Sequence, residues 1–262
     1  MGVWVHPAIQ AAYFGSSVAL SADGNTLFAS APFETASPTQ RRLGAVYVYT
    51  LRPTVLLWDL QARLVGRNSE QFDNFGGQIS VSSDGNTLAV SAIAERGSGG
   101  GVTQPGPTPD DDDDGLPDAG AVYVFMREAA VWSQHAYVKP SNPDASDVFG
   151  TAVALSADGR MLAVGAMGEA SRAAGVGGDE SDNDAADAGA AYVFQLSDGQ
   201  WSQRSYVKAA NPQSADQFGS AVALSGDGNV LAVGAPLEDG KSLTLGGADN
   251  NDATDAGAVY LY

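Results

Sequence analysis

Three clusters of carboxylates are the residues of this chain best suited to chemistry. The windows 110–118, 179–187 and 249–255 contain 6, 5 and 3 Asp or Glu residues and no Lys or Arg, which is 14 of the 31 acidic residues. Calcium prefers such oxygen ligands and takes about six to eight of them. In the window 110–118, Asp recurs at positions 1, 3, 5 and 9 with Gly at position 6, a pattern that lets a loop turn sharply around a cation.

We therefore predict calcium sites in all three clusters. The predicted ligands are Asp110, Asp112, Asp114 and Asp118 in the first cluster, Asp179, Ser181, Asn183 and Asp187 in the second, and Asp249, Asn251 and Asp255 in the third. The alternative is that each cluster is a solvated run of charge in a loop rich in small residues.

The composition excludes several other kinds of site. The chain has no Cys, so disulfides, thiol catalysis and thiolate metal sites are excluded. A formal net charge of −18 repels phosphate backbones and argues against nucleic-acid binding. No segment approaches about 18 consecutive apolar residues, so we expect no membrane insertion. Residues 1–10 have neither a basic start nor an apolar run, so no signal peptide is visible.

The chain that carries these clusters is built from four copies of one unit. A Phe-Gly pair opens each copy, at Phe14, Phe75, Phe149 and Phe218. A Glu follows 20 residues after each Phe, at Glu34, Glu95, Glu169 and Glu238. A Gly-Ala-(Val/Ala)-Tyr segment then begins at Gly44, Gly120, Gly189 and Gly257. Self-similarity of this length indicates a repeat architecture.

Each copy predicts four strands that are covered on both faces. In the last copy, residues 221–225 and 230–235 alternate Val or Leu with Ala or Gly, and the Asp-Gly at 227–228 predicts a tight turn between them. Residues 258–262 give a third strand, and Trp-containing segments such as 201–208 a fourth. Four-stranded sheets repeated around an axis are the blades of a β-propeller. We predict one all-β domain over 1–262, a propeller of four blades that start near 14, 75, 149 and 218.

The two ends of the chain look complementary. Trp58, Trp132 and Trp201 each lie 17 residues before the next Phe-Gly pair, whereas the last copy stops at Tyr262 without such a segment. Residues 1–13 hold a spare Trp4, so we expect them to complete the last blade and close the ring. The alternative is a part of a larger ring, or a half-ring that pairs with another chain, and the chain could be a monomer or a homodimer.

The motifs resemble a known repeat. Phe-Gly followed by Gly234-Ala235-Pro236 and by Gly-Ala-Val-Tyr-Leu-Tyr at 257–262 resembles the FG-GAP repeat, the blade unit of integrin α-subunit propellers and many bacterial surface proteins. The resemblance implies a propeller with metal-supported loops that acts in recognition or adhesion, at the cell surface or outside the cell. We predict a non-enzymatic, calcium-binding module whose partner is a protein or a glycan. An enzyme that acts on polysaccharide is the alternative.

The remaining candidates favour structural roles. The Glu of each copy is expected to cap a loop or accept a backbone N–H rather than act as a catalytic acid or base. The Trp side chains are expected to pack between blades rather than form a platform for sugars. His6 and His135 lack any partner motif. Lys139 and Lys208, which recur beside the Trp segments, are expected on the solvated edge of the sheets.

Overall fold

The chain folds into four antiparallel sheets that follow one another in sequence order. The computed structural model describes residues 12–35, 42–104, 114–240 and 253–262. Within these ranges every regular element is a strand, so the predicted all-β fold is confirmed. No helix that could cross a membrane is found in these same ranges. Each sheet corresponds to one predicted copy, and we call the sheets blades 1 to 4.

The blades differ in the number of their strands. Blade 1 contains β1 (Val18–Leu20), β2 (Thr26–Ala31), β3 (Ala45–Arg52) and β4 (Leu57–Leu64). Blade 2 contains β5 (Phe75–Val81), β6 (Thr87–Ala92), β8 (Ala121–Glu128), β9 (Val131–Val138) and, at its outer edge, β7 (Val102–Thr103). Blade 3 contains β10 (Phe149–Leu155), β11 (Met161–Ala166), β12 (Ala190–Ser197) and β13 (Gln200–Val207). Blade 4 contains β14 (Ala221–Leu224), β15 (Leu231–Ala235) and β16 (Ala258–Leu261).

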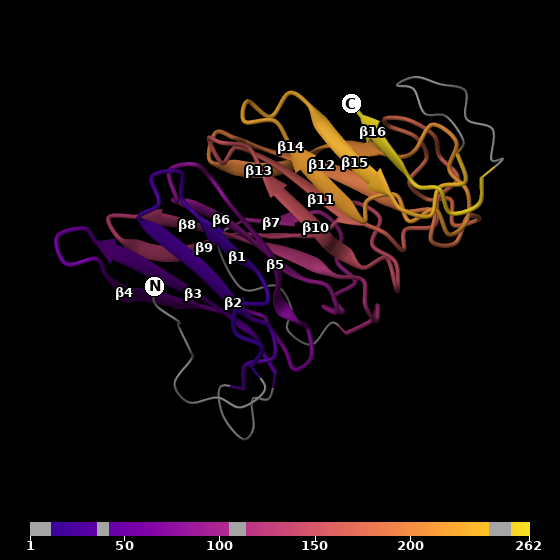
Figure 1. The fold of residues 1–262 in the computed structure, drawn as a ribbon. Coiled ribbons are helices and arrows are strands. Elements are labelled where there is room, and N and C mark those ends of the chain that lie inside the picture. The colour runs from indigo at the N-terminus through magenta and orange to yellow at the C-terminus, as the bar shows by residue number, and fades with distance from the viewer. Residues whose placement is uncertain (1–11, 36–41, 105–113, 241–252) are drawn as a thin grey trace.

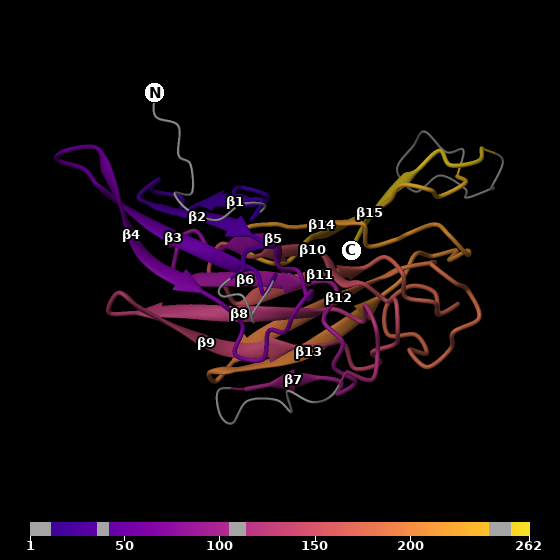
Figure 2. The ribbon, with the colours of Figure 1, turned by 90° about the horizontal axis from the view of Figure 1, so that it is seen from below.

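The prediction of four strands in every copy is therefore wrong for two blades. Blade 2 gains the short β7, which pairs with β9, and blade 4 has three described strands in the order β14-β15-β16. Figure 2 shows the first strands of the blades, β1, β5, β10 and β14, along one side of the molecule, with β7, β9 and β13 on the other side. The repeats thus share one orientation, with equivalent strands placed next to each other.

Predicted Asp-Gly turns close the first hairpin of each blade. In blade 1, Asp23 Oδ1 accepts hydrogen bonds from Ser21 Oγ at 2.5 Å and from the backbone N of Asn25 at 3.0 Å. Gly24 adopts a φ of +70°, which glycine reaches without a steric penalty. The Ser and Asp contacts recur in the other three turns. The local sequence therefore specifies this turn four times.

Backbone hydrogen bonds also link these turns to one another. The N–H of Ala22 donates to the carbonyl of Ser83 at 2.8 Å, and the N–H of Ser83 donates to that of Ala157 at 2.8 Å. The N–H of Ala157 donates to the carbonyl of Gly226 at 2.9 Å. We call this series the turn ladder. It joins all four blades at the same end of their sheets.

The Phe-Gly pair of one copy meets the Gly-Ala segment of the copy before it. Gly189 and Phe218 form a parallel bridge, and the N–H of Phe218 donates to the carbonyl of Ala188 at 3.0 Å. A Cβ at Gly189 would lie 1.9 Å from the Phe218 carbonyl oxygen, so only glycine fits there. Two motifs that are far apart within a copy are therefore neighbours across the boundary between blades.

Each pair of consecutive blades encloses a layer of apolar side chains. Between blades 2 and 3, Phe149 and Tyr192 pack edge to face, with ring centroids 5.5 Å apart, against the buried Val122 and Val124. A similar layer lies between blades 1 and 2. Strands that are apolar on both faces are thus covered on both faces, as the sequence predicts.

The far face of blade 4 carries no neighbouring sheet among the described strands. Val259 and Leu261 are 70% and 55% exposed, although their equivalents in blade 3, Ala191 and Val193, are 0% and 8% exposed. Blades 1 and 4 lie at the two ends of the series in Figure 1, and the main contacts between blades join consecutive ones. Ring closure is thus not seen between described strands, and the predicted closing residues 1–11, including Trp4, lie outside them.

Candidate functional site

The Glu that recurs in each copy is the centre of a buried polar cluster. In blade 3, Glu169 is 1% exposed. Its Oε2 accepts hydrogen bonds from Lys208 Nζ at 2.6 Å and from the backbone N of Ser171 at 3.2 Å. Its Oε1 accepts one from Tyr206 Oη at 2.8 Å. Several charge-assisted hydrogen bonds therefore compensate for the loss of water around this carboxylate.

Blade 2 repeats the same cluster with its own residues. Glu95 Oε1 accepts from Tyr137 Oη at 2.5 Å and from the backbone N of Gly97 at 3.1 Å. Lys139 Nζ donates to the other oxygen, Oε2, at 2.8 Å. The backbone hydrogen bonds that we expected for this Glu are present in both blades, and the buried lysines are an additional feature.

Blades 1 and 4 depart from this pattern. In blade 1 the cation is Arg63, whose Nε and Nη2 both lie 2.8 Å from Glu34 Oε1. In blade 4, Glu238 is fully buried and accepts hydrogen bonds from Asn211 Nδ2 at 3.0 Å and from Tyr260 Oη at 2.9 Å. Within the described part of the chain, no Lys or Arg pairs with it.

The prediction that Lys139 and Lys208 lie on a solvated edge is wrong. Both lysines are 0% exposed. Burial lowers the pKa of Lys208, and the charge and hydrogen bond of Glu169 oppose that shift. The signal in the sequence was the position of each Lys, 19 residues after the Gly of the Gly-Ala segment in the same copy. A Lys at a fixed place in a repeat that also holds a fixed Glu indicates an ion pair.

A second buried carboxylate lies beside each cluster in blades 2, 3 and 4. Asp147, two residues before Phe149, is 3% exposed and accepts a hydrogen bond from the backbone N of Asp144 at 2.8 Å. Burial, with a contribution from the charge of Glu169, raises the pKa of Asp147 to about 7. The equivalent Asp73 and Asp216 have pKa values raised by burial to about 7 and about 6.

The sequence analysis did not single out these aspartates, although Asp-x-Phe-Gly recurs in three copies. A carboxyl group that titrates near neutral pH could exchange protons. However, these carboxyl groups are buried below the loops and bonded to the backbone. The arrangement therefore favours a role in holding the loop that precedes each Phe-Gly pair.

The predicted calcium ligands are only partly within the described residues. Asp110, Asp112, Asp249 and Asn251 lie outside them, whereas Asp114, Asp118 and Asp255 lie within them. The Asp two residues before each Gly-Ala segment adopts a left-handed backbone, with φ of 54° at Asp118, 56° at Asp187 and 52° at Asp255. Asp tolerates this conformation better than most residues, so its recurrence there also has a conformational explanation.

In the second cluster the predicted ligands contact different partners. Asp179 Oδ1 accepts hydrogen bonds from the N and Oγ of Ser181, at 2.9 and 2.7 Å. Asn183 Nδ2 instead donates to Asp144 Oδ2 at 2.9 Å. Within the described ranges, no group of three or more His, Asp or Glu side chains is arranged to hold a metal ion. Calcium binding by these loops therefore stays a prediction, and it would need the loop side chains to turn towards one point.

The Trp residues of β9 and β13 pack between blades. Trp132 lies edge to face with Phe28 of blade 1, with ring centroids 5.7 Å apart, and its Nε1 donates to Gln61 Oε1 at 2.9 Å. Trp201 is 2% exposed and belongs to the core between blades 2 and 3. This agrees with the packing role expected for them. His135 also lies on β9, whereas His6 is outside the described residues.

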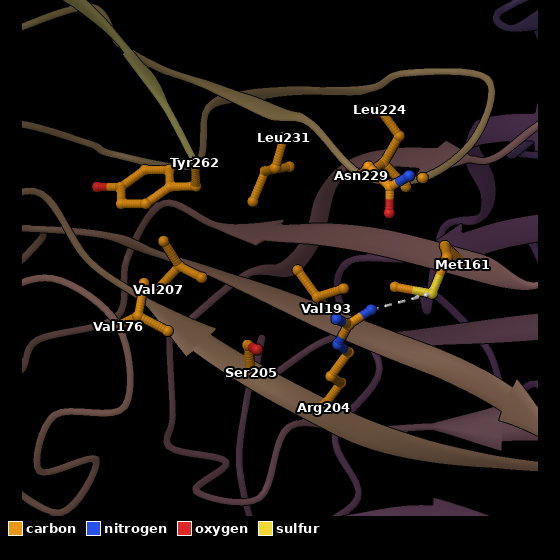
Figure 3. Close-up of a pocket in the computed structure, with 11 residues that line it drawn as sticks. Met161, Val176, Val193, Arg204, Ser205, Val207, Leu224, Asn229, Leu231 and Tyr262 are labelled. Carbon is orange, nitrogen blue, oxygen red and sulfur yellow. Dashed lines mark hydrogen bonds between the residues drawn. The ribbon is translucent and has the colours of Figure 1, made fainter.

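A cavity of about 170 Å³ opens between blades 3 and 4. Figure 3 shows Val193 and Arg204 of blade 3 on one side of it, and Leu231 and Tyr262 of blade 4 on the other. Arg204 Nη1 lies 3.9 Å from Met161 Sδ at one end. The walls are mostly apolar with one cation, which is a suitable environment for an aromatic side chain.

Comparison with known proteins gives one repeat family and two distant folds. Residues 132–194 and 201–262 match the family described as FG-GAP repeat. Hydrazine synthase from Kuenenia stuttgartiensis is 14% identical with a TM-score of 0.47, and the match covers 89% of this chain and 44% of that one. Sqt1 from Saccharomyces cerevisiae is 11% identical with a TM-score of 0.44, and the match covers 89% and 45%. The chain thus spans less than half the length of either structure. No curated protein matches its sequence.

Proposed function

We propose, from the FG-GAP repeats that this chain carries, that the protein is a non-enzymatic recognition module of the cell-surface or extracellular type. Its blades would act as a rigid support, and the loops between the second and third strands of each blade would bind a protein or a glycan partner. Loops of this kind can vary without disturbing the sheets that hold them.

The observation that best supports this proposal is the engagement of the repeated carboxylates. Glu95 and Glu169 each accept hydrogen bonds from a Tyr, a Lys and a backbone N–H, and both are almost fully buried. A catalytic acid or base must reach a proton on a substrate. Groups held in this way stabilise the blades, which leaves the exposed loops as the surface available to a partner.

Screening the purified chain against immobilised glycans and surface proteins tests the proposal. We expect binding that is lost when the second acidic loop, residues 179–187, is replaced by a Gly-Ser loop of equal length. Replacement of Asp59 by Asn, on exposed β4 of blade 1, is the matched control and should leave binding unchanged. Turnover of a polysaccharide that Asp147→Asn abolishes without loss of the fold would instead support the enzyme alternative.

Calcium binding by the acidic loops is the second part of the proposal. The described residues of these loops offer carboxylate, hydroxyl and amide oxygens, which suit calcium. We expect weak binding, with a dissociation constant of about 10⁻⁴ to 10⁻³ M, as in extracellular modules. Calorimetric titration with calcium chloride should give heat that disappears in the loop replacement. Absence of heat, together with an unchanged melting temperature, would refute the calcium site and leave the recognition proposal standing.

The arrangement of the blades favours one further candidate, a partial ring that another chain completes. The observation in its favour is the exposed far face of blade 4, with Val259 at 70% exposure. Light scattering distinguishes a monomer of 26.8 kDa from a dimer of twice that mass. A monomer at all accessible concentrations would count against pairing between two copies of this chain.

A further inference from the structure

Strand β16 presents an edge that is paired in the other blades. Its counterparts β8 and β12 each pair with a following strand, β9 and β13. Among the described residues, β16 pairs only with β15. An open edge of this kind offers unpaired backbone N–H and C=O groups to an added strand.

The strands at this position in blades 2 and 3 supply two things besides backbone pairing. The first is aromatic packing, because Trp132 and Tyr137 of β9 lie in the core between blades 1 and 2. The second is a cation, because Lys139 and Lys208, directly after β9 and β13, pair with the buried Glu of the same blade. An added strand in blade 4 would have to supply both.

Blade 4 retains the acceptor for that cation. Glu238 is 0% exposed, and its partners in the described residues are the neutral Asn211 and Tyr260. Asp216 beside it carries a second carboxyl group. A buried carboxylate is costly unless a cation and hydrogen bonds satisfy it. The charge of this cluster therefore matches a Lys or Arg.

Blade 4 also retains the space for the aromatic groups. The walls Val193, Arg204 and Leu231 of the cavity in Figure 3 are the repeat equivalents of residues in blades 1 and 2 that the side chains of β9 cover. Gln61, which hydrogen-bonds Trp132, is the equivalent of Arg204. An arginine at this position can stack on an aromatic ring.

We propose that the edge of β16 and the adjoining cavity form a docking site for an extended strand of a partner polypeptide, with aromatic side chains for the cavity and a Lys or Arg for Glu238. The pairing of Ala191 with Val207 and of Tyr192 with Tyr206 fixes the register. By analogy, a Tyr of the partner lies opposite Tyr260 and the cation opposite Ala258. This mode of recognition is strand addition, and it is independent of the acidic loops.

The chemistry argues against the terminal segment that we expected to close the ring. Residues 1–13 contain Trp4 but no Lys or Arg, so they could fill the cavity and would leave Glu238 without a cation. Blade 1, which follows that segment, also lies at the far end of the series of blades (Figure 1).

A synthetic peptide tests the site on the full chain. The probe is a fluorescein-labelled peptide with the sequence of residues 200–208, QWSQRSYVK, followed by anisotropy. We expect saturable binding that weakens at least about tenfold when norleucine replaces the peptide Lys, because that Lys becomes a buried charge pair. Glu238→Gln should bind the Lys and norleucine peptides equally, and Asp59→Asn, far from the site, should behave as wild type.

A second variant keeps the test decisive if Glu238→Gln folds poorly. Ser205→Trp fills the cavity from β13 without touching Glu238, and it should abolish binding of both peptides. Equal binding of a scrambled peptide, or no saturation by about 1 mM peptide, would overturn the proposal. A stable dimer that excludes the peptide would also overturn it, because the occupant would then be a second copy of the chain.

Discussion

Replacement of Lys208 by Met tests the role of the buried ion pair most directly. The substitution removes an ammonium group 2.6 Å from Glu169 Oε2 and keeps a flexible apolar side chain in its place. Glu169 would retain its hydrogen bonds from Tyr206 and Ser171 but would lose its only cation among the described residues.

The size of the effect follows from the burial of both partners, which are 0% and 1% exposed. Removing one partner of such a pair leaves an uncompensated charge in the core and costs about 3 to 5 kcal/mol. By contrast, the Arg52–Asp59 pair has side chains that are 56% and 48% exposed. Its loss in Asp59→Asn should cost about 1 kcal/mol or less.

Urea unfolding followed by tryptophan fluorescence measures both variants against the wild type. We expect the midpoint of Lys208→Met to fall strongly and its melting temperature to drop by about 6 to 20 °C. The double variant Lys208→Met with Glu169→Gln should recover part of the loss, because no buried charge remains. If Lys208→Met costs no more than Asp59→Asn, the argument that the lysine compensates a buried carboxylate fails.

Three further predictions follow from the same contacts. Gly165→Ala should cost about 3 kcal/mol or more, because its Cβ would lie 1.8 Å from a backbone oxygen of blade 4, whereas the equivalent Gly234→Ala, with a nearest contact at 3.4 Å, should be close to neutral in urea unfolding. Val122→Thr should destabilise by more than about 1 kcal/mol and Val259→Thr by less than about 0.5 kcal/mol, since the two side chains are 0% and 70% exposed; equal losses would contradict the open face of blade 4. Asp147 has a folded pKa of about 7 against 3.8 when unperturbed, so the folded state binds more protons and the wild type loses stability as pH rises from about 4 to about 7. Asp147→Asn should therefore be more stable than wild type by roughly 1 to 4 kcal/mol at pH 8 and similar to it at pH 4, and the reverse order would refute the raised pKa.

The repeat spacing made most of the fold predictable. Phe-Gly, the Asp-Gly turn and Gly-Ala-(Val/Ala)-Tyr recur in register, and each marks a place where backbone geometry is tightly constrained. Gly24 needs a positive φ, and Gly189 sits against the carbonyl of Phe218, so no other residue can substitute easily. Such constraints are local or depend on one close contact, and they leave a clear trace in the sequence.

The polar core and the ring were harder to predict for physical reasons. Lys139 looks like a surface residue because its partner, Glu95, is 44 residues earlier in the chain and only the folded sheet brings them together. Whether the blades close into a ring depends on the angle between successive sheets, which a hydrophobic pattern does not specify. The calcium ligands depend on loop conformation, and residue type alone leaves that open as well.

The turn ladder has a consequence for how the molecule comes apart. Each rung connects neighbours only, from Ala22 to Ser83, Ala157 and Gly226, so disruption of one rung releases a terminal blade while the rest persists. In an array with nearest-neighbour coupling, thermal opening starts at the extremities and moves inward. Amide exchange should therefore be fastest in β14 to β16 and slowest in β10 and β11, and the molecule would unravel like a stack losing its outermost plate.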